Sequence, residues 1–214
     1  MLKNLILKST LPLILVLAMS SCDDSDDGLI VQDHDKNEFM TIMHNMNAQM
    51  DAMEMTGDAD HDFASMMIVH HQGAIDMATL LLKKGDDEMI RSMADHLISE
   101  QQAEQQKLNE FVKTHTPEPS EIGQEYNNEM MKSMEKSKNL KDIVVLTGDA
   151  DEDFAQLMIV HHQTANDNAQ AIIHHSHHQE IIDMAKTMSA DQTQEMTELS
   201  DWLIANRNIQ NAGR

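Results

Sequence analysis

The sequence predicts an all-α protein in which a duplicated helical hairpin forms a four-helix bundle. Helix-favouring residues dominate, while aromatic residues make up 3% of the chain and Gly and Pro number only 7 and 3. Strand signals are nearly absent, because "DIVVL" (142–146) is the only β-branched run and it precedes a helix start. The third observation is a tandem repeat. "TGDADHDFASMMIVHHQGAIDMA" (56–78) matches "TGDADEDFAQLMIVHHQTANDNA" (147–169) at a constant offset of 147 − 56 = 91 residues.

Each repeat is expected to form a short helix followed by a long helical hairpin. The repeats span 38–112 and 129–203, and a linker (113–128) that contains two of the three prolines separates them. Gly57 and Gly148 break the chain, after which Asp58 or Asp60 can cap the next helix. The hairpin turns are "KKGDD" (83–87) and "HHSHH" (174–178). Four long helices are expected, at about 60–84, 87–113, 151–175 and 178–206.

The N-terminus resembles a bacterial lipoprotein signal. Lys3 and Lys8 form a basic start, "LPLILVLA" (11–18) is too short to span a bilayer, and small residues precede Cys22. Residues 1–21 are therefore expected to be a signal peptide, with Cys22 as the lipidated first residue. Ordinary signal cleavage with an unused thiol is the alternative.

These signals also set the expected organisation and location of the chain. Residues 22–35, which include "DDSDDG", form an acidic flexible tether before the helical domain of 36–206. We expect an exported bacterial lipoprotein that a lipid anchor holds to a membrane, facing the periplasm or at the outer membrane or cell surface.

Charge and cysteine content exclude some partners and sites. The formal net charge of −22 argues against nucleic acid, whose phosphates attract Lys and Arg. The same charge suits a metal cation as partner, although an acidic solvated surface also explains most of the carboxylates. With one cysteine, the chain forms no intramolecular disulfide and no thiolate zinc cluster.

Helical spacing places two histidine pairs on apolar faces. His70 and His71 interrupt a stripe that otherwise holds residues such as Phe63, Met67 and Ala74. His161 and His162 interrupt the matching stripe of the second repeat. The partner helix of each hairpin turns one Gln and one Glu inward in mid-helix. These are Gln101 and Glu104 in the first repeat, and Gln192 and Glu195 in the second.

Two interpretations of these buried polar groups stay open, because burying them costs free energy unless they are paired or bound. Glu can accept a hydrogen bond from His in a purely structural network. Alternatively, the histidines ligate a metal together with Met66, Met67 or Met158, which lie about one turn away.

The sequence also leaves open which glutamate contacts which histidine. Counted from the hairpin turn, His71 and Glu104 are not level, so a cross-bundle pair such as His70 with Glu195 is as plausible.

The double "MIVHHQ…A…A" followed by "Q..E…L..W" resembles the DUF305 family over residues 36–206. The resemblance implies a ferritin-like four-helix fold and export, and some members of the family bind copper outside the cytoplasmic membrane. The second copy departs from the first, since Asn166 and Asn168 replace Ile75 and Met77. If Met77 is a ligand, the two copies have unequal sites. The motif falls on His70, His71, Gln72, Gln101 and Glu104, and on His161, His162, Gln163, Gln192 and Glu195.

The ligand types favour a soft metal ion. Imidazole together with thioether sulfur suits Cu(I) or Ag(I), whereas Mg²⁺ and Ca²⁺ prefer oxygen. Residues 39–55 form a methionine-rich helix whose Met face can offer ligands or simply pack in the core. Met43, Met46, Met50 and Met53 share this face, with Met40 and His44 beside it. The "HHSHH" turn is expected to be accessible, either as a weak Cu(II) or Zn²⁺ site or as an incidental polar turn, and His34, His61 and His115 are expected at the surface.

An enzyme is the less favoured class. Ferritin-like di-iron sites use Glu-x-x-His, and this spacing occurs nowhere in the chain; no nucleophile motif, phosphate loop or cysteine pair is present either. The first functional hypothesis is therefore a lipid-anchored copper protein for sequestration, delivery or tolerance through Met/His sites. The second is a structural or partner-binding helical module whose buried His, Gln and Glu form a hydrogen-bond network without metal.

Overall fold

The computed structural model describes residues 31–212, with side chains described up to residue 206. The expected signal peptide, Cys22 and most of the acidic tether lie outside the described residues. In the described part, a 3₁₀ turn (His34–Lys36) precedes six α-helices and there is no strand. The helices are α1 (Glu38–Asp51), α2 (Ala59–Lys84), α3 (Glu88–Thr114), α4 (Glu121–Asp142), α5 (Ala150–His175) and α6 (Gln179–Ala212). The all-α prediction is confirmed, and the four expected long helices correspond to α2, α3, α5 and α6.

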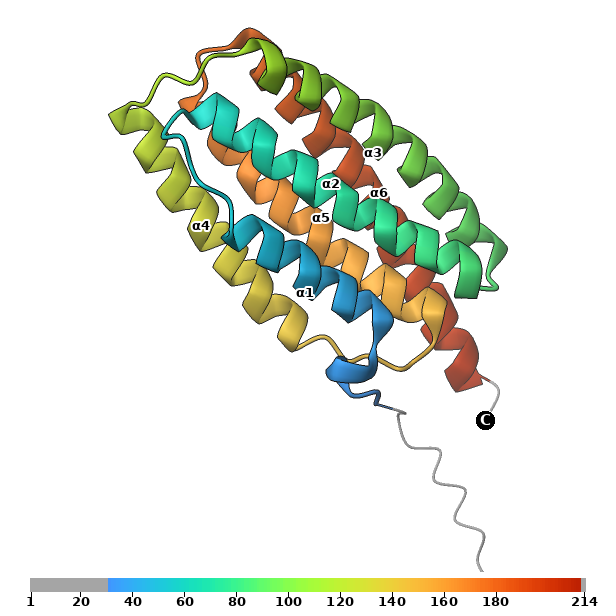
Figure 1. Cartoon of the computed structure of the whole chain (residues 1–214). Coiled ribbons are helices and arrows are strands. Elements are labelled where there is room, and N and C mark those ends of the chain that lie inside the picture. The colour runs from blue at the N-terminus through green and yellow to red at the C-terminus, as the bar shows by residue number, and fades with distance from the viewer. Residues whose placement is uncertain (1–30, 213–214) are drawn as a thin grey trace, which may run out of the picture.

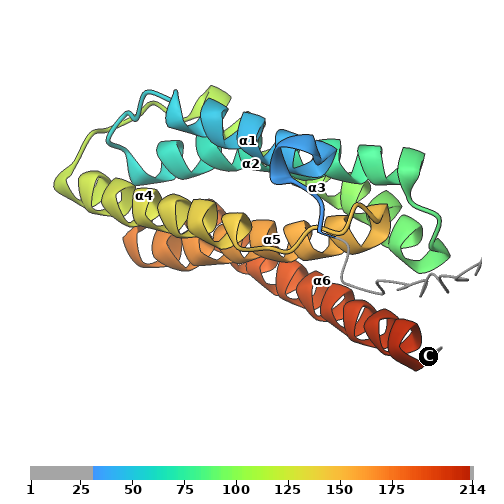
Figure 2. The same ribbon diagram turned by 90° about the horizontal axis from the view of Figure 1, so that it is seen from below.

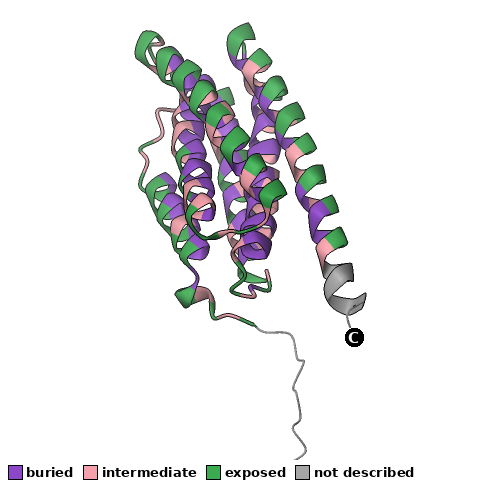
Figure 3. Ribbon diagram, turned by 90° about the vertical axis from the view of Figure 1, so that its right-hand side faces the viewer, coloured by how far each residue is buried: buried purple, intermediate pink, exposed green. Residues whose placement is uncertain are grey.

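The helices form two stacked layers (Figures 1 and 2). One layer holds α1, α2 and α3, the other holds α4, α5 and α6, and α2 packs against α5 at the centre. These two central helices run antiparallel. The backbone N–H groups of Asp86 and Asp87, just after α2, donate to Asp151 at the start of α5, at 3.0 and 3.2 Å. Buried residues line the surfaces between the helices and exposed residues lie outside (Figure 3).

The start of each central helix is built in the same way. Gly57 and Gly148 adopt positive φ angles of 83° and 84°, which favour glycine. Asp58 then caps α2 by accepting from the His61 N–H, and Asp149 caps α5. Asp58 is therefore the cap of α2, whereas Asp60 contacts His178 from the α5–α6 turn, with Asp60 Oδ2 2.8 Å from His178 Nδ1.

The segment between the repeats differs from the expectation. Helix α4 begins at Glu121, inside the predicted linker 113–128, so only residues 115–120 are non-helical. Ser120 caps the helix by accepting from the Gly123 N–H, and Tyr126 and Met130 extend its buried face upstream. Because this apolar face begins early, α4 has 22 residues and is not the short helix that was expected.

Three histidines that were expected at the surface are at least half-buried. The prediction is wrong for His115, whose side chain is 12% exposed and whose Nε2 lies 3.0 Å from Asp58 Oδ2. The His34 ring donates to the Val144 carbonyl at 2.8 Å, and the His61 ring lies 6.0 Å from that of His115. These contacts anchor the N-terminal segment and the α3–α4 connection. No described helix is both long enough and apolar enough to cross a membrane.

Candidate metal centre

The two histidine pairs meet at the centre of the molecule. His70 and His71 lie midway along α2, His161 and His162 lie midway along α5, and all four side chains are fully buried. The rings of His70 and His161 are 3.6 Å apart between centroids, tilted by 32°. The His161 Nε2–H group donates to the His70 carbonyl at 3.1 Å. Because α2 and α5 are antiparallel, two residues that match across the repeat face each other directly.

Each pair reaches the glutamate of its own hairpin. His71 Nε2 lies 3.0 Å from Glu104 Oε2, and His162 Nε2 lies 2.9 Å from Glu195 Oε2. The cross-bundle pairing of His70 with Glu195 is therefore not the one that forms. The glutamate side chains are 16% and 15% exposed, so they stand between the buried rings and solvent. In both contacts the carboxylate is close to the ring nitrogen without satisfying hydrogen-bond geometry.

Most ring nitrogens of this cluster lack a hydrogen-bond partner. Of the eight ring nitrogens, only His161 Nε2 has one among the described residues. Gln101 Oε1 and both polar atoms of the Gln192 side chain are also buried and unpartnered. Each buried polar group left unsatisfied costs about 1–3 kcal/mol, so a protein rarely gathers this many without something to bind them. Imidazole nitrogens and carboxylate oxygens are metal ligands, and this arrangement fits an ion.

Electrostatics keep the central rings neutral. Burial, reinforced by His71 and His162, holds the pKa of His70 well below its usual range. Burial, reinforced chiefly by His70 and His162, does the same to the pKa of His161. A neutral imidazole carries a free lone pair, which is the form that ligates metals.

The methionines named from the sequence are all buried. Met66, Met67 and Met77 on α2 and Met158 on α5 are fully buried. On α1, Met40, Met43, Met46 and Met50 are buried against the core, and Met53 is partly so. Met46 lies directly over Gly73 of α2, where a Cβ atom would be 2.4 Å from its sulfur. The Met face of α1 therefore packs on α2, the helix that carries His70 and His71.

The second half is more polar where the copies differ. Asn168, which replaces Met77, donates to the Thr164 carbonyl at 2.8 Å and to Ser133 Oγ at 3.2 Å. Asn166 donates to Thr193 Oγ1 at 3.1 Å. No thioether is available at these two positions, so most of the candidate sulfur ligands lie in the first half.

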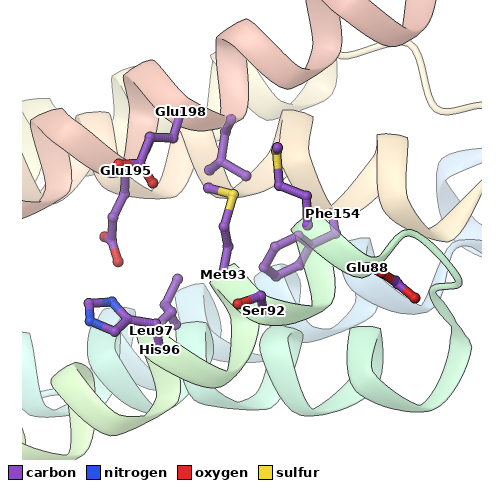
Figure 4. Close-up of a pocket in the computed structure, with 10 residues that line it drawn as sticks. Glu88, Ser92, Met93, His96, Leu97, Phe154, Glu195 and Glu198 are labelled. Atoms are coloured by element: carbon purple, nitrogen blue, oxygen red, sulfur yellow. The ribbon is translucent and has the colours of Figure 1, made fainter.

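A second group of ligand-type side chains lies in a groove between α3 and α6 (Figure 4). The groove has a volume of about 610 Å³, and Glu195 extends from α6 toward His96 on α3. With Glu100, these side chains bring three ligand atoms within 4.8 Å of one another. Sequence reasoning missed His96 and Glu100; their i, i+4 spacing beside Gln101 and Glu104 was the available signal.

The "HHSHH" turn is divided between exposed and anchored residues. His174 and His177 are exposed, as the sequence predicts, and the His178 side chain is 48% exposed. His175 is 14% exposed, with Nε2 3.3 Å from Glu129 Oε2. The turn is thus tied to α2 and α4 rather than free.

Comparison with known proteins agrees with this fold. The family model described as "Domain of unknown function (DUF305)" matches residues 25–112 and 60–203. A solved structure of CopM in the Ag-bound form is 22% identical with a TM-score of 0.51, over 69% of this chain and 96% of that one. CopM in the Cu(II)-bound form is 22% identical with a TM-score of 0.52, over 68% and 96% of the two chains.

A DUF305 fragment from Deinococcus radiodurans is also similar, at 20% identity and a TM-score of 0.50, over 68% and 95% of the two chains. No curated protein matches the chain. The likeness to these structures shows that the fold is shared.

Proposed function

Because the chain belongs to the DUF305 family, we propose that it binds copper, as Cu(I), for sequestration, delivery or tolerance. The observation that carries the proposal is the cluster of four fully buried imidazoles on α2 and α5, in which seven of eight ring nitrogens have no hydrogen-bond partner among the described residues. The similarity to CopM, solved with Ag and with Cu(II), supports this choice of ion.

The ligands divide by chemical type. His70, His71, His161 and His162 offer nitrogen, and Glu104 and Glu195 offer carboxylate oxygen at the edge of the cluster. Thioether sulfur comes from Met66, Met67, Met77 and Met158, and from Met43, Met46 and Met50 on α1. Imidazole with thioether selects soft ions such as Cu(I) and Ag(I). Gln101 and Gln192, buried on α3 and α6 with unpartnered polar atoms, would orient these ligands once an ion is bound.

The cellular setting belongs to the same proposal. A signal peptide over residues 1–21 and a lipid on Cys22 place the helical domain outside the cytoplasmic membrane, facing the periplasm or at the outer membrane or cell surface. The acidic tether (22–35) then joins the anchor to the domain. In that setting the protein intercepts copper before it enters the cell.

Equilibrium dialysis against Cu(I) buffered by a competing chelator tests the site. We expect the wild type to retain Cu(I) at sub-micromolar free copper and His70→Ala/His161→Ala to bind at least about tenfold more weakly. His174→Ala/His177→Ala, which removes two exposed histidines, is the matched control and is expected to retain copper. Met43→Leu/Met46→Leu/Met50→Leu keeps apolar volume but removes sulfur, so weaker binding would identify α1 as a ligand source.

The competing candidate is a structural or partner-binding module with a polar core. The hydrogen bond from His161 to the His70 carbonyl favours it, and so do the two His–Glu contacts. Failure of the wild type to retain Cu(I) would favour this candidate, and unaltered retention by the His70/His161 variant would remove the central pair as ligands.

A further inference from the structure

The groove between α3 and α6 holds three ligand-type side chains, of which the copper proposal uses only Glu195. His96 Nδ1 lies 3.1 Å from Glu100 Oε2 one turn along α3, and Glu195 approaches from α6. The ligand atoms of the three residues lie within 4.8 Å of one another, the only such group of His, Cys, Asp or Glu in the described part of the chain. Two helices far apart in sequence thus converge on one point.

We propose that His96, Glu100 and Glu195 form a second metal site, which binds a borderline divalent cation such as Zn²⁺ or Cu²⁺. One imidazole and two carboxylates suit these ions, while the absence of sulfur from the set disfavours Cu(I). The site differs in position and in ligand set from the buried cluster proposed for Cu(I), and Glu195 is the one residue common to both.

A buried imidazole contacts one residue of this site. His162 is fully buried, and its Nε2 lies 2.9 Å from Glu195 Oε2 without a hydrogen bond. A carboxylate bound to a metal is commonly held by a neighbouring imidazole, which fixes its orientation. Glu195 therefore connects the groove with the buried histidines, and it can be positioned by His162 while it faces a cation in the groove.

The charge around the groove favours a cation. Glu104 and Asp191 lie near Glu100 and Glu195, so four carboxylates gather across the two helices. Burial, together with the neighbouring Glu195, Asp191 and Glu104, raises the pKa of Glu100, even though His96 opposes the shift. Burial, together with Glu104 and Glu195, raises the pKa of Asp191. A divalent cation would relieve this mutual repulsion.

Geometry permits binding with small movements. Ligand atoms around a tetrahedral zinc ion lie about 3.4 Å apart, so the group must contract by roughly 1 Å. The side chains of His96 and Glu100 are 69% and 39% exposed and can rotate to close that gap. Three protein ligands leave the fourth position to water, an arrangement that favours exchange over permanent structural binding.

The site is expected at only one of the two positions that the repeat relates. At the offset of 91 residues, His96 corresponds to Thr187 and Glu100 corresponds to Asp191. The mirror group of Glu104, Thr187 and Asp191 therefore lacks an imidazole. Thr187 supplies a matched control position on α6, where it lines a different pocket together with Glu104.

Competition of Zn²⁺ with a chelator tests the proposal in a His174→Gln/His177→Gln background, which removes two exposed histidines of the "HHSHH" turn. His96→Ala and Glu100→Gln are each expected to weaken the tightest Zn²⁺ site at least about tenfold, whereas Thr187→Ala leaves it unchanged. Loss of one nitrogen coupling from the Cu²⁺ electron paramagnetic resonance spectrum of His96→Ala would identify the imidazole ligand.

Thermal unfolding gives a second readout. Without metal, Glu100→Gln is expected to melt above the background protein because it removes one repelling charge; with Zn²⁺, the background protein gains stability and the variant does not. Zn²⁺ affinity in His96→Ala within twofold of the background protein would overturn the proposal. His96→Ala is expected to retain Cu(I), which separates the two sites. A wild type that binds Zn²⁺ but fails to bind Cu(I) would contradict the proposed function and leave the groove site standing.

Discussion

The rings of His70 and His161 set the chemistry of the molecule at the scale of single residues. Their centroids lie 3.6 Å apart in a fully buried position, and among the described residues their only hydrogen bond runs from His161 to the His70 carbonyl. A charged imidazole at this buried position would lose its solvation and lie against the neighbouring rings. The structure therefore depends on both rings staying neutral, which ties its stability to pH.

The pH dependence has a definite sign. Burial and neighbouring histidines hold the folded-state pKa of His70 and His161 well below the unfolded value of about 6.5. Below pH of about 6.5 the unfolded chain thus binds more protons, so stability is lost as pH falls and is complete above that value. The loss is expected to reach up to about 1.4 kcal/mol per pH unit for each histidine.

Urea unfolding of the metal-free protein between about pH 7.5 and about pH 5 measures this effect. His70→Leu/His161→Leu is the comparison, because it removes both titrating groups while keeping apolar volume. The wild type should lose stability relative to this variant as the pH falls; equal pH profiles for the two proteins would contradict the assignment.

At the scale of elements, the first helix of each repeat, α1 or α4, packs against the opposite half of the molecule. Asn37 at the start of α1 donates to Asp153 on α5 at 2.7 Å, and Asn127 on α4 donates to Asp62 on α2 at 2.8 Å. The same two aspartates hold the loops before their own helices. Asp62 accepts from Thr56 and Gly57, and Asp153 accepts from Thr147 and Gly148. Asp62 and Asp153 therefore each stabilise the loop before their own helix and a contact between the two layers.

Asp153→Ala is therefore expected to lower the unfolding free energy by at least about 3 kcal/mol, because it leaves four donors without their charged acceptor in a buried place. Asp62→Ala should behave alike. Asp95→Ala, at an exposed position of α3, is the control and should stay within about 0.5 kcal/mol of the wild type. Chemical denaturation measures all three, and a loss below about 1 kcal/mol for Asp153→Ala would show that the loops hold without it.

At the scale of the whole molecule, an acidic chain carries its proposed metal ligands in the core and in one groove. The net charge of −22 attracts cations generally, but only the residues brought together by the fold offer defined ligands. No described helix is long and apolar enough to cross a membrane. We propose that a lipid at Cys22 attaches the protein to a membrane.

Cys22→Ser is expected to release the protein from the membrane fraction of expressing bacteria and to abolish incorporation of labelled fatty acid, because each buried methylene of a lipid contributes about 0.8 kcal/mol to anchoring. Helix content and melting temperature of the helical domain should not change, which separates lost anchoring from lost folding. An unchanged membrane fraction for this variant would rule out Cys22 as the anchor.

The sequence alone determined the helices and the inward direction of the histidines. Both depend on local spacing, since the 3.6-residue period places His70 and His71 on the buried face of α2 whatever packs against it. The starts of the four long helices lie within one residue of the predicted positions. The sequence missed the early start of α4, where a proline-containing segment concealed the buried face of Tyr126 and Met130.

The tertiary structure decided which groups meet. His71 and Glu104 are not level along the hairpin, yet they are 3.0 Å apart because helical side chains tilt toward the N-terminus of their own helix. In antiparallel helices that tilt moves the two side chains toward each other. The stacking of His70 on His161, and the meeting of His96 and Glu100 with Glu195, depend on the register of helices about a hundred residues apart in sequence. Local periodicity carries no information on that register, so only the packed molecule shows these contacts.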